Sequence, residues 1–450
     1  MARHSVSALV EDLDARIPYL AQLEKYYAGR QALAYLSPDA RKALGDRLGL
    51  MAVNYCRLAV VSLAERMRVT GFTVDGQRSE RAWDLWTGSD LDQLSGAAHR
   101  DALALGSSYA IVWADRSGRP RVTVESAHQV SVQRDPITGE IVGAIKRWED
   151  QLTGGRIEAH VMSYRPDQIV HLVGKANTTA ALSPVSTTPN PLGVVPVVEL
   201  RNTDRVAAPP LSELDDLMPL VDALNKIYAD MMTASEYYAR PRRWATGLEL
   251  EEDEAGNPVA PPESNRFLVN EAPDGKFGQL AGADLSSYRT SVDVIVQAIQ
   301  GVSALPSHYV GITTATPPGA DGVRASEAAL TARAESRLAS FGRSWEQVMR
   351  LALAIDSGTA VDAHDVRIKW ADAATRSVAQ EADSAVKLHA EGILTTNEIR
   401  EQFGLDPLDD AAKGVDQTDT PTVPDTTEAA PAVATPKPAL SGPAVNERKF

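Results

Sequence analysis

The chain has 450 residues, of which 44% are hydrophobic and 23% are charged, so it can form two or three globular units and is neither a fibre nor a disordered polymer. The formal net charge of -15 argues against tight binding of nucleic acid, because Lys and Arg drive that binding by displacing counterions from phosphates. Cys56 is the only cysteine, which excludes an intramolecular disulfide and fits a reducing compartment.

No run of about 18 apolar residues is present, and acidic residues occur early in the N-terminal sequence MARHSVSALVEDLDARI. We therefore expect a chain without a membrane span or a signal peptide, made in a cytoplasm.

The first third of the chain predicts helices followed by strands. Apolar spacing indicates an amphipathic helix from Val6 to Tyr27, in which Pro18 is a candidate kink. A second helix is predicted from Pro38 to Arg68, with Cys56 in its packing face. After a short strand at residues 72–74, the segment from Ala82 to Leu105 reads as helical.

Between Ser107 and Val173 the apolar period changes from helical to alternating, and turn residues separate the runs. This pattern predicts an antiparallel meander of six strands: SYAIVWAD, RVTVES, QVSVQRD, EIVGAIKRWE, RIEAHVMSY and QIVHLV. His160 and His171 lie in it, but a metal or catalytic pair needs a third ligand, so we interpret both as structural. The segment from Asn177 to Val195 reads as a loop before the strand PVVEL.

Ser212 and Asp215 form an acidic capping box, which predicts a helix that continues to about Tyr238. Arg240, Arg242 and Arg243 follow it, either as cations at the negative end of the helix dipole or as a phosphate site. A strand-and-loop excursion comes next. Its acidic run lacks the spacing of a calcium loop and is interpreted as a solvated face: Glu249, Glu251, Glu252, Asp253 and Glu254.

Two periodic segments then flank a loop of about twenty residues, PSHYVGITTATPPGADGVRA. The helix before it is predicted from Asp284 to Ala304 and ends before Pro306. The helix after it has about 30 residues, with a bend expected at Ser340, Gly342 and Ser344. Its predicted apolar face consists of Leu330, Ala334, Leu338, Phe341, Trp345, Val348, Ala352 and Ile355.

The C-terminal part predicts the strand VRIKWAD and two short helices, at residues 379–390 and 395–403. Thr395 and Glu398 form a second capping box, and Gly404 suits the end of the helix. From Asp416 to Lys437 large apolar residues are too few to offset the entropy of ordering, so a flexible tail is expected.

The motifs of common enzymes are absent from the sequence. GADGVRAS lacks the Gly-Lys of a phosphate-binding loop, and there is no G-x-S-x-G, H-E-x-x-H or cysteine cluster. We expect no enzyme, no metal and no cofactor, although an acid-base pair of carboxylates stays open as an alternative.

Three stretches in this order resemble the portal proteins of tailed double-stranded DNA bacteriophages, the siphophage-type head-tail connectors. They are YYAGRQALAYLSPDARKALGDRL, LNKIYADMMTASEYYARPRRWATG and TATPPGADGVRASEAAL, and the resemblance extends to about Pro407. It implies an α+β portal fold with long stem helices, a mixed α/β wing, a small strand-containing clip and a short helical crown. The implied segments are the wing (1–210), first stem helix (211–240), clip (241–283), second stem helix (284–305), tunnel loop (306–324), long kinked wing helix and strand (325–372), crown (373–411) and flexible tail (412–450).

The resemblance also implies a homododecameric ring at one vertex of the virion capsid, built in the host cytoplasm, through which the genome is packaged, retained and ejected. The implied partners are other copies of the chain, double-stranded DNA passing without sequence specificity, terminase, a head-completion or adaptor protein and the major capsid protein, with no membrane. The clip acids would bind partners. The tunnel loop would face DNA through Thr313, Thr314, Thr316, Pro317, Gly319 and Arg324.

Uncharged loop residues suit this role, because each phosphate neutralised by a fixed cation adds a salt-dependent anchor that slows translocation. Arg324 has two open interpretations, a phosphate contact or an ion pair between subunits. The alternative to a portal is another structural head or adaptor protein without a DNA channel.

Overall fold

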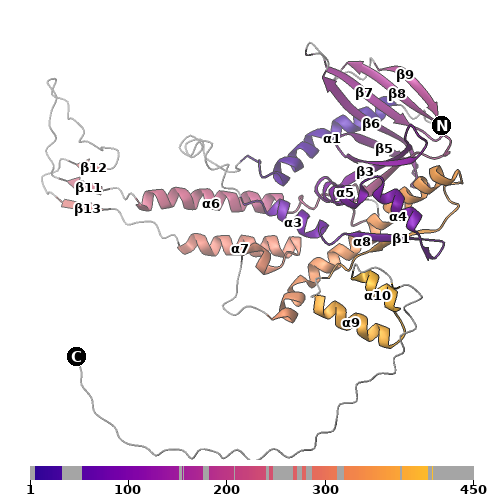
Figure 1. The fold of residues 1–450 in the computed structure, drawn as a ribbon. Helices are drawn as coiled ribbons and strands as arrows, with labels where there is room; N and C mark the ends of the chain where they lie inside the picture. Colours follow the sequence, from indigo (N-terminus) through magenta and orange to yellow (C-terminus); the bar gives the residue numbers. More distant parts are fainter. Residues whose placement is uncertain are drawn as a thin grey trace, which may run out of the picture. The chain divides into compact units, whose positions relative to one another are not determined.

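The computed structural model of the chain divides into two units, Met1–Thr375 and Arg376–Phe450. It describes residues 6–32, 53–151, 155, 157–175, 182–206, 208–239, 243–246, 267–270, 276–279, 286–311, 319–374, 378–403 and 408. Helices and strands are mixed within these ranges, which confirms the predicted α+β class (Figure 1). None of the helices in this part of the chain is long and apolar enough to cross a bilayer.

The N-terminal helices follow the predicted amphipathic pattern where the structure describes them. Helix α1 (Val6–Tyr27) has the predicted bounds and contains Pro18. Helix α3 (Tyr55–Ala64) is the described part of the second predicted helix, whose earlier residues fall outside the described ranges. Cys56 is buried in the core, as predicted.

Residues Ala82 to Leu105 are helical as predicted, except for a break that divides them between α4 (Glu80–Thr87) and α5 (Leu91–Leu105). Arg121, from a strand that follows, stabilises the break between them. Its guanidinium donates to the Gly88 carbonyl at 2.7 Å and pairs with the Asp90 carboxylate at 2.9 Å. Both helices bury apolar residues in the same core, so the apolar spacing continues across the break.

The predicted single meander is wrong, since the strands divide between two antiparallel sheets. Alternation predicts strands but not their partners, and one predicted loop contains an additional exposed edge strand, β9. The first sheet has the order β10-β3-β4: β10 (Val197–Arg201), β3 (Ser107–Ala114) and β4 (Pro120–Ser126). The second has the order β5-β6-β7-β8-β9: β5 (Val130–Arg134), β6 (Ile141–Gln151), β7 (Ile157–Tyr164), β8 (Gln168–Lys175) and β9 (Ser183–Pro189).

Helix α8 (Ala320–Ser357) is the longest helix that the structure describes and runs through the main core. The predicted apolar face is confirmed, because each of its residues is buried or half-buried. A third sheet packs on α8, with β14 (Val366–Trp370) and β2 (Gln77–Arg78) on either side of β1 (Val69–Val74). Gly342 permits this close approach, since a Cβ atom there would lie 3.2 Å from Ile368.

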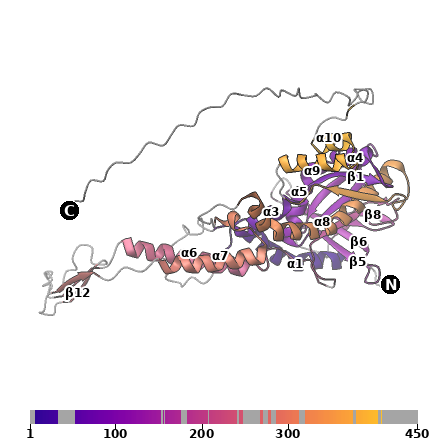
Figure 2. The same ribbon diagram turned by 90° about the horizontal axis from the view of Figure 1, so that it is seen from below.

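Helices α6 (Met218–Ala239) and α7 (Ser286–Ser303) pack side by side, as Figures 1 and 2 both show. The first of these helices begins later than predicted. Pro219 has no amide hydrogen for the preceding turn, and residues 213–217 form turns instead of regular helix. The predicted cap Asp284 lies outside the described residues.

Three short strands lie in the segment that joins these two helices: β11 (Arg243–Thr246), β12 (Phe267–Asn270) and β13 (Lys276–Gln279). β11 pairs with β12 in parallel and with β13 in antiparallel orientation. The predicted excursion therefore contains a small sheet.

The second unit contains helices α9 (Val378–Ala390) and α10 (Thr396–Gln402), close to their predicted bounds. The predicted capping box is confirmed. Thr395 donates its amide hydrogen to the Glu398 carboxylate at 2.7 Å, and the Glu398 amide donates to the Thr395 hydroxyl at 3.3 Å.

A neutral histidine lies at the centre of the first unit. His99 is fully buried, and its Nε2 accepts a hydrogen bond of 2.8 Å from the Trp345 indole nitrogen. Because an indole can only donate, this His99 nitrogen carries no proton. Burial lowers the pKa of His99 to about 3.

Replacing His99 with Gln is expected to make folding less sensitive to acid. Below its ordinary pKa of 6.5 the unfolded chain binds a proton at His99 that the folded chain excludes until about pH 3. The free energy of unfolding therefore falls by about 1.4 kcal/mol per pH unit in this window. Gln can accept the Trp345 hydrogen bond but does not titrate. Urea unfolding of both proteins between about pH 7 and pH 5 measures the difference, and parallel pH profiles would contradict it.

Candidate functional site

The described part of the candidate site is the two ends of the predicted tunnel loop. Gly319 is the N-cap residue of α8, and Arg324 lies half-buried in the first turns of that helix. The other loop and clip residues predicted for the site lie outside the described residues: Thr313, Thr314, Thr316, Pro317, Glu249, Glu251, Glu252, Asp253 and Glu254.

A left-handed residue marks the first end of the loop. Ala304, directly after α7, has a φ of 59°, a conformation that costs about 1–2 kcal/mol for a residue with a Cβ atom. The Ser303 hydroxyl stabilises this bend, because it donates to the Ile299 carbonyl at 2.6 Å and accepts from the Leu305 amide at 3.4 Å. Leu305 is buried, and the 3-10 helix η4 (Ser307–Val310) follows.

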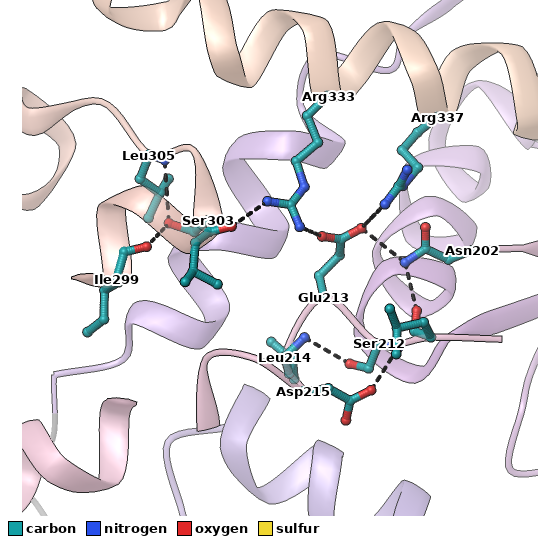
Figure 3. Close-up of polar contacts among 12 residues, drawn as sticks. Asn202, Ser212, Glu213, Leu214, Asp215, Ile299, Ser303, Leu305, Arg333 and Arg337 are labelled. Atoms are coloured by element: carbon teal, nitrogen blue, oxygen red, sulfur yellow. Dashed lines mark hydrogen bonds and ion pairs between the residues drawn. The ribbon is translucent and has the colours of Figure 1, made fainter. Parts of the chain in front are cut away.

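We call the first polar cluster at this end the Glu213 junction: Asn202, Glu213, Val302, Arg333 and Arg337. Figure 3 shows the side chains of Asn202, Glu213, Arg333 and Arg337. The Glu213 side chain is only 6% exposed, yet its carboxylate has three partners. Arg333 donates to Oε2 at 2.6 Å, whereas Arg337 and Asn202 donate to Oε1 at 2.9 and 3.0 Å. These partners satisfy a buried charge that would otherwise cost several kcal/mol.

Arg333 extends the Glu213 junction to α7. Its Nη1 donates to the Val302 carbonyl at 2.7 Å. The last four carbonyls of a helix have no partner inside the helix, so an arginine is a suitable donor there. The end of α7 and the middle of α8, on opposite sides of the loop, therefore meet at one guanidinium.

The turn that carries Glu213 is itself fixed to α5. Ser212 donates its hydroxyl to the Ala104 carbonyl at 2.6 Å, and the Glu213 amide donates to the Leu103 carbonyl at 2.9 Å. The predicted contact between Ser212 and Asp215 is also present, at 3.2 Å. Glu213 thus has a defined place between the globular core and α6.

A second cluster, the Glu327 junction, consists of Arg66, His308, Tyr309 and Glu327. Arg66 and Glu327 form an ion pair of 3.0 Å with side chains 8% and 6% exposed. The Tyr309 hydroxyl donates to the Glu327 carboxylate at 3.5 Å, and His308 Nε2 lies 3.4 Å from it. This carboxylate, just after the loop, therefore contacts His308 and Tyr309 at the first end of the loop.

Arg66 connects the Glu327 junction to a third segment. It donates to the Ala373 carbonyl at 2.7 Å, close to the boundary of the first unit. A cavity of about 280 Å³ lies beside it, lined by both acidic and basic residues: Ser62, Glu65, Arg66, Arg68, Tyr309 and residues 371–374. Within the described ranges no group of three or more His, Cys, Asp or Glu side chains could hold a metal ion.

Sequence reasoning missed both junctions. Arg333 and Arg337 are spaced by four residues on the polar side of α8, a signal that indicates one helix face. Nothing in the linear sequence connects them with Glu213, which lies 120 residues before Arg333. Only the return of α8 onto the core brings these charges together.

Charge pairing thus holds the two ends of the loop in place. Comparison with known proteins shows the family of the chain. The model of the family described as "Phage portal protein, SPP1 Gp6-like" matches residues 7–413. The chain belongs to this family. The predicted resemblance to phage portal proteins is thus confirmed, and portal proteins are structural proteins of the virion, not a class of enzymes.

Relatives described as portal proteins occur in mycobacterial phages. The portal protein of Mycobacterium phage D29 is 29% identical over 377 residues, covering 79% of this chain and 76% of the relative. The portal protein of Mycobacterium phage L5 is 29% identical over 363 residues, covering 76% of this chain and 73% of the relative.

Among solved structures, the chain aligns with one described as "Neck of native GTA particle computed with C12 symmetry". The TM-score is 0.44 at 14% identity, and the alignment covers 83% of this chain and 96% of that chain.

Replacing Arg66 with Ala is expected to lower the free energy of unfolding by about 3–5 kcal/mol, because Glu327 then keeps a buried charge without its main partner. The matched control is Arg78→Ala, which breaks an exposed pair with Glu80 and should change stability little. Chemical denaturation of the full chain measures both. Equal losses in the two variants would show that burial of the Arg66 pair has no special importance.

Proposed function

We propose that this chain assembles head to tail into a homododecameric ring at one vertex of the phage head, and that DNA passes through the central channel during packaging and ejection. The observation that carries the proposal is the family match over residues 7–413, which includes α6, α7, the loop and α8. Identical subunits joined head to tail form a ring when their rotation closes.

The geometry around the loop supports this proposal. Val302 is joined to Arg333, and Tyr309 is joined to Glu327, so contacts with α8 hold the approach to the loop in two places. Gly319 begins α8 on the other side. A loop supported in this way can contact a passing duplex while its ends keep their positions.

The residues proposed to face DNA are uncharged apart from Arg324. Thr313, Thr314 and Thr316 offer hydroxyl groups, and the chain as a whole has a formal net charge of -15. Fixed cations in the channel would bind phosphates in a salt-dependent manner and resist movement. A polar lining with few cations suits guidance of DNA better than capture of DNA. For Arg324 a phosphate contact and an ion pair between subunits are both compatible with this proposal.

We further propose that helices α6 and α7 form the stem and that residues 241–283, with strands β11 to β13, form the clip. The acidic run Glu249–Glu254 would give the clip a negative surface for terminase during packaging and for a head-completion protein afterwards. The remaining globular part would contact the major capsid protein, and α9 and α10 would form the crown.

The test of the assembly is electron microscopy and mass photometry of the purified full chain. The proposal expects closed rings with a central pore and a mass of about twelve subunits. A stable monomer, or an oligomer without a pore, would favour the alternative of a structural head or adaptor protein without a channel.

Charge added to the loop is expected to slow the passage of DNA. Replacing Thr313, Thr314 and Thr316 with Lys should reduce the packaging rate. It should also make the slope of log K for DNA binding against log salt concentration more negative by about 0.9 for each phosphate contacted. The matched control replaces the same residues with Ser, which keeps the hydroxyl groups and adds no charge. Packaging measured with purified terminase and heads reports the rate.

Deletion of residues 313–319 separates a role in DNA contact from a role in architecture. Rings should form from the deleted chain while packaging or retention of DNA is impaired. If rings fail to form, the loop is architectural. If the Lys and Ser variants package at equal rates, the loop does not contact the duplex.

Neutralising the clip acids is expected to weaken docking of partners. Replacing the five acidic residues between Glu249 and Glu254 with Gln or Asn should reduce the affinity of a purified head-completion protein about tenfold at low salt. The difference should shrink as salt rises, because salt screens exposed charges. Binding titrations at several salt concentrations test this, and an unchanged affinity at low salt would remove these residues from the docking surface.

A further inference from the structure

The Glu213 junction contains two arginines from successive turns of α8 that bind the same carboxylate. Arg333 donates to Glu213 Oε2, and Arg337 donates to Oε1 through Nε and Nη2 at 3.2 and 2.9 Å. Both pairs are largely protected from solvent, since the arginine side chains are 28% and 12% exposed. With respect to the carboxylate the two arginines are therefore similar.

The two arginines differ in one respect, which is contact with α7. Arg333 uses its other terminal nitrogen to donate to the Val302 carbonyl at 2.7 Å. Among the described residues, the hydrogen bonds of Arg337 go only to Glu213. Arg333 is thus bidentate between two segments, whereas Arg337 is bidentate on one carboxylate.

The place where Arg333 binds is directly before the bend that leads into the loop. Val302 is two residues before Ala304, which has the left-handed φ of 59°. A non-glycine residue keeps such a conformation only where surrounding contacts hold it. Leu305 is buried after the bend, and Arg333 holds the backbone before it.

Glu213, which binds Arg333, is itself held in place by hydrogen bonds to the core. Its turn is bonded to α5 at the Leu103 carbonyl, and Asn202 Nδ2 donates both to Glu213 and to the Leu211 carbonyl. Because this carboxylate holds Arg333, the second hydrogen bond of Arg333 fixes the end of α7 relative to the core. A lysine could not do the same, since its single ammonium lacks the planar pair of donors.

We infer that Arg333 is a positioning residue for the tunnel loop: it fixes the end of α7 against the core and thereby sets where the loop begins, whereas Arg337 serves only to stabilise the buried Glu213 carboxylate. The inference deepens the proposed function and rests on it for its consequence in DNA retention. The positioning itself is a property of the chain and can be measured without DNA.

Hydrogen-deuterium exchange of the full chain, in whatever assembly it forms, tests the positioning. Arg333→Gln should raise exchange of the amides at residues 303–311 about tenfold, whereas Arg337→Gln should change it less than about twofold. The midpoint temperature of thermal unfolding should decrease in both variants, since both lose a bond to Glu213. Equal exchange at residues 303–311 in the two variants would overturn the inference and leave Arg333 a purely structural partner of Glu213.

A second variant covers the case in which Arg333→Gln does not fold. Arg333→Lys keeps a positive charge for Glu213 but cannot bridge to Val302 with the same geometry. It should fold and still raise exchange at residues 303–311 above that of the parent chain. Exchange equal to the parent would overturn the inference, because it would show that the second hydrogen bond is dispensable.

DNA retention in phage particles separates this inference from the proposed function. Particles with Arg333→Lys should lose packaged DNA on mild heating more readily than particles with Arg337→Lys. If exchange at residues 303–311 rises as expected but retention is unchanged, Arg333 positions the segment and the proposed role of the loop in holding DNA is wrong. If exchange does not rise, the positioning role is wrong whatever the particles retain.

Discussion

Two buried carboxylates, Glu213 and Glu327, hold the described ends of the loop in this protein. A carboxylate removed from water is tolerated only when cations and hydrogen-bond donors surround it closely. Arg333 and Arg337 surround Glu213, and Arg66 pairs with Glu327. Because these partners come from segments far apart in the sequence, satisfying each charge also fixes the relative positions of those segments.

Helix α8 takes part in both junctions and in the main core. Its apolar face packs against the sheets through residues such as Phe341 and Trp345, while Glu327, Arg333 and Arg337 point to the polar junctions. The same helix therefore contributes to stability through apolar burial and to local order through charge.

The two junctions have different partners beyond the loop. The Glu213 junction reaches α5, the start of α6 and the end of α7. The Glu327 junction reaches the segment after α3 and, through Arg66, the Ala373 carbonyl. One end of the loop is thus joined to the end of α7, and the other is joined to a segment near the boundary of the first unit.

Strong periodicity in the order of the residues was enough to predict several helices and strands, such as α1, α8 and the strands of the two main sheets. The sequence also carried the family resemblance. Apolar spacing reflects which side of an element is buried, and this is a local property that the chain order records.

Which elements meet depends on contacts between residues far apart in the chain and could not be predicted from local patterns. The contact of Arg121 with Asp90 lies at the break between α4 and α5, and strand pairing divides the predicted meander into two sheets. The pairing of Glu213 with Arg333 is of the same kind. Charged residues on a helix surface look alike in a sequence, and their partners are chosen when the chain folds back and removes some of them from water.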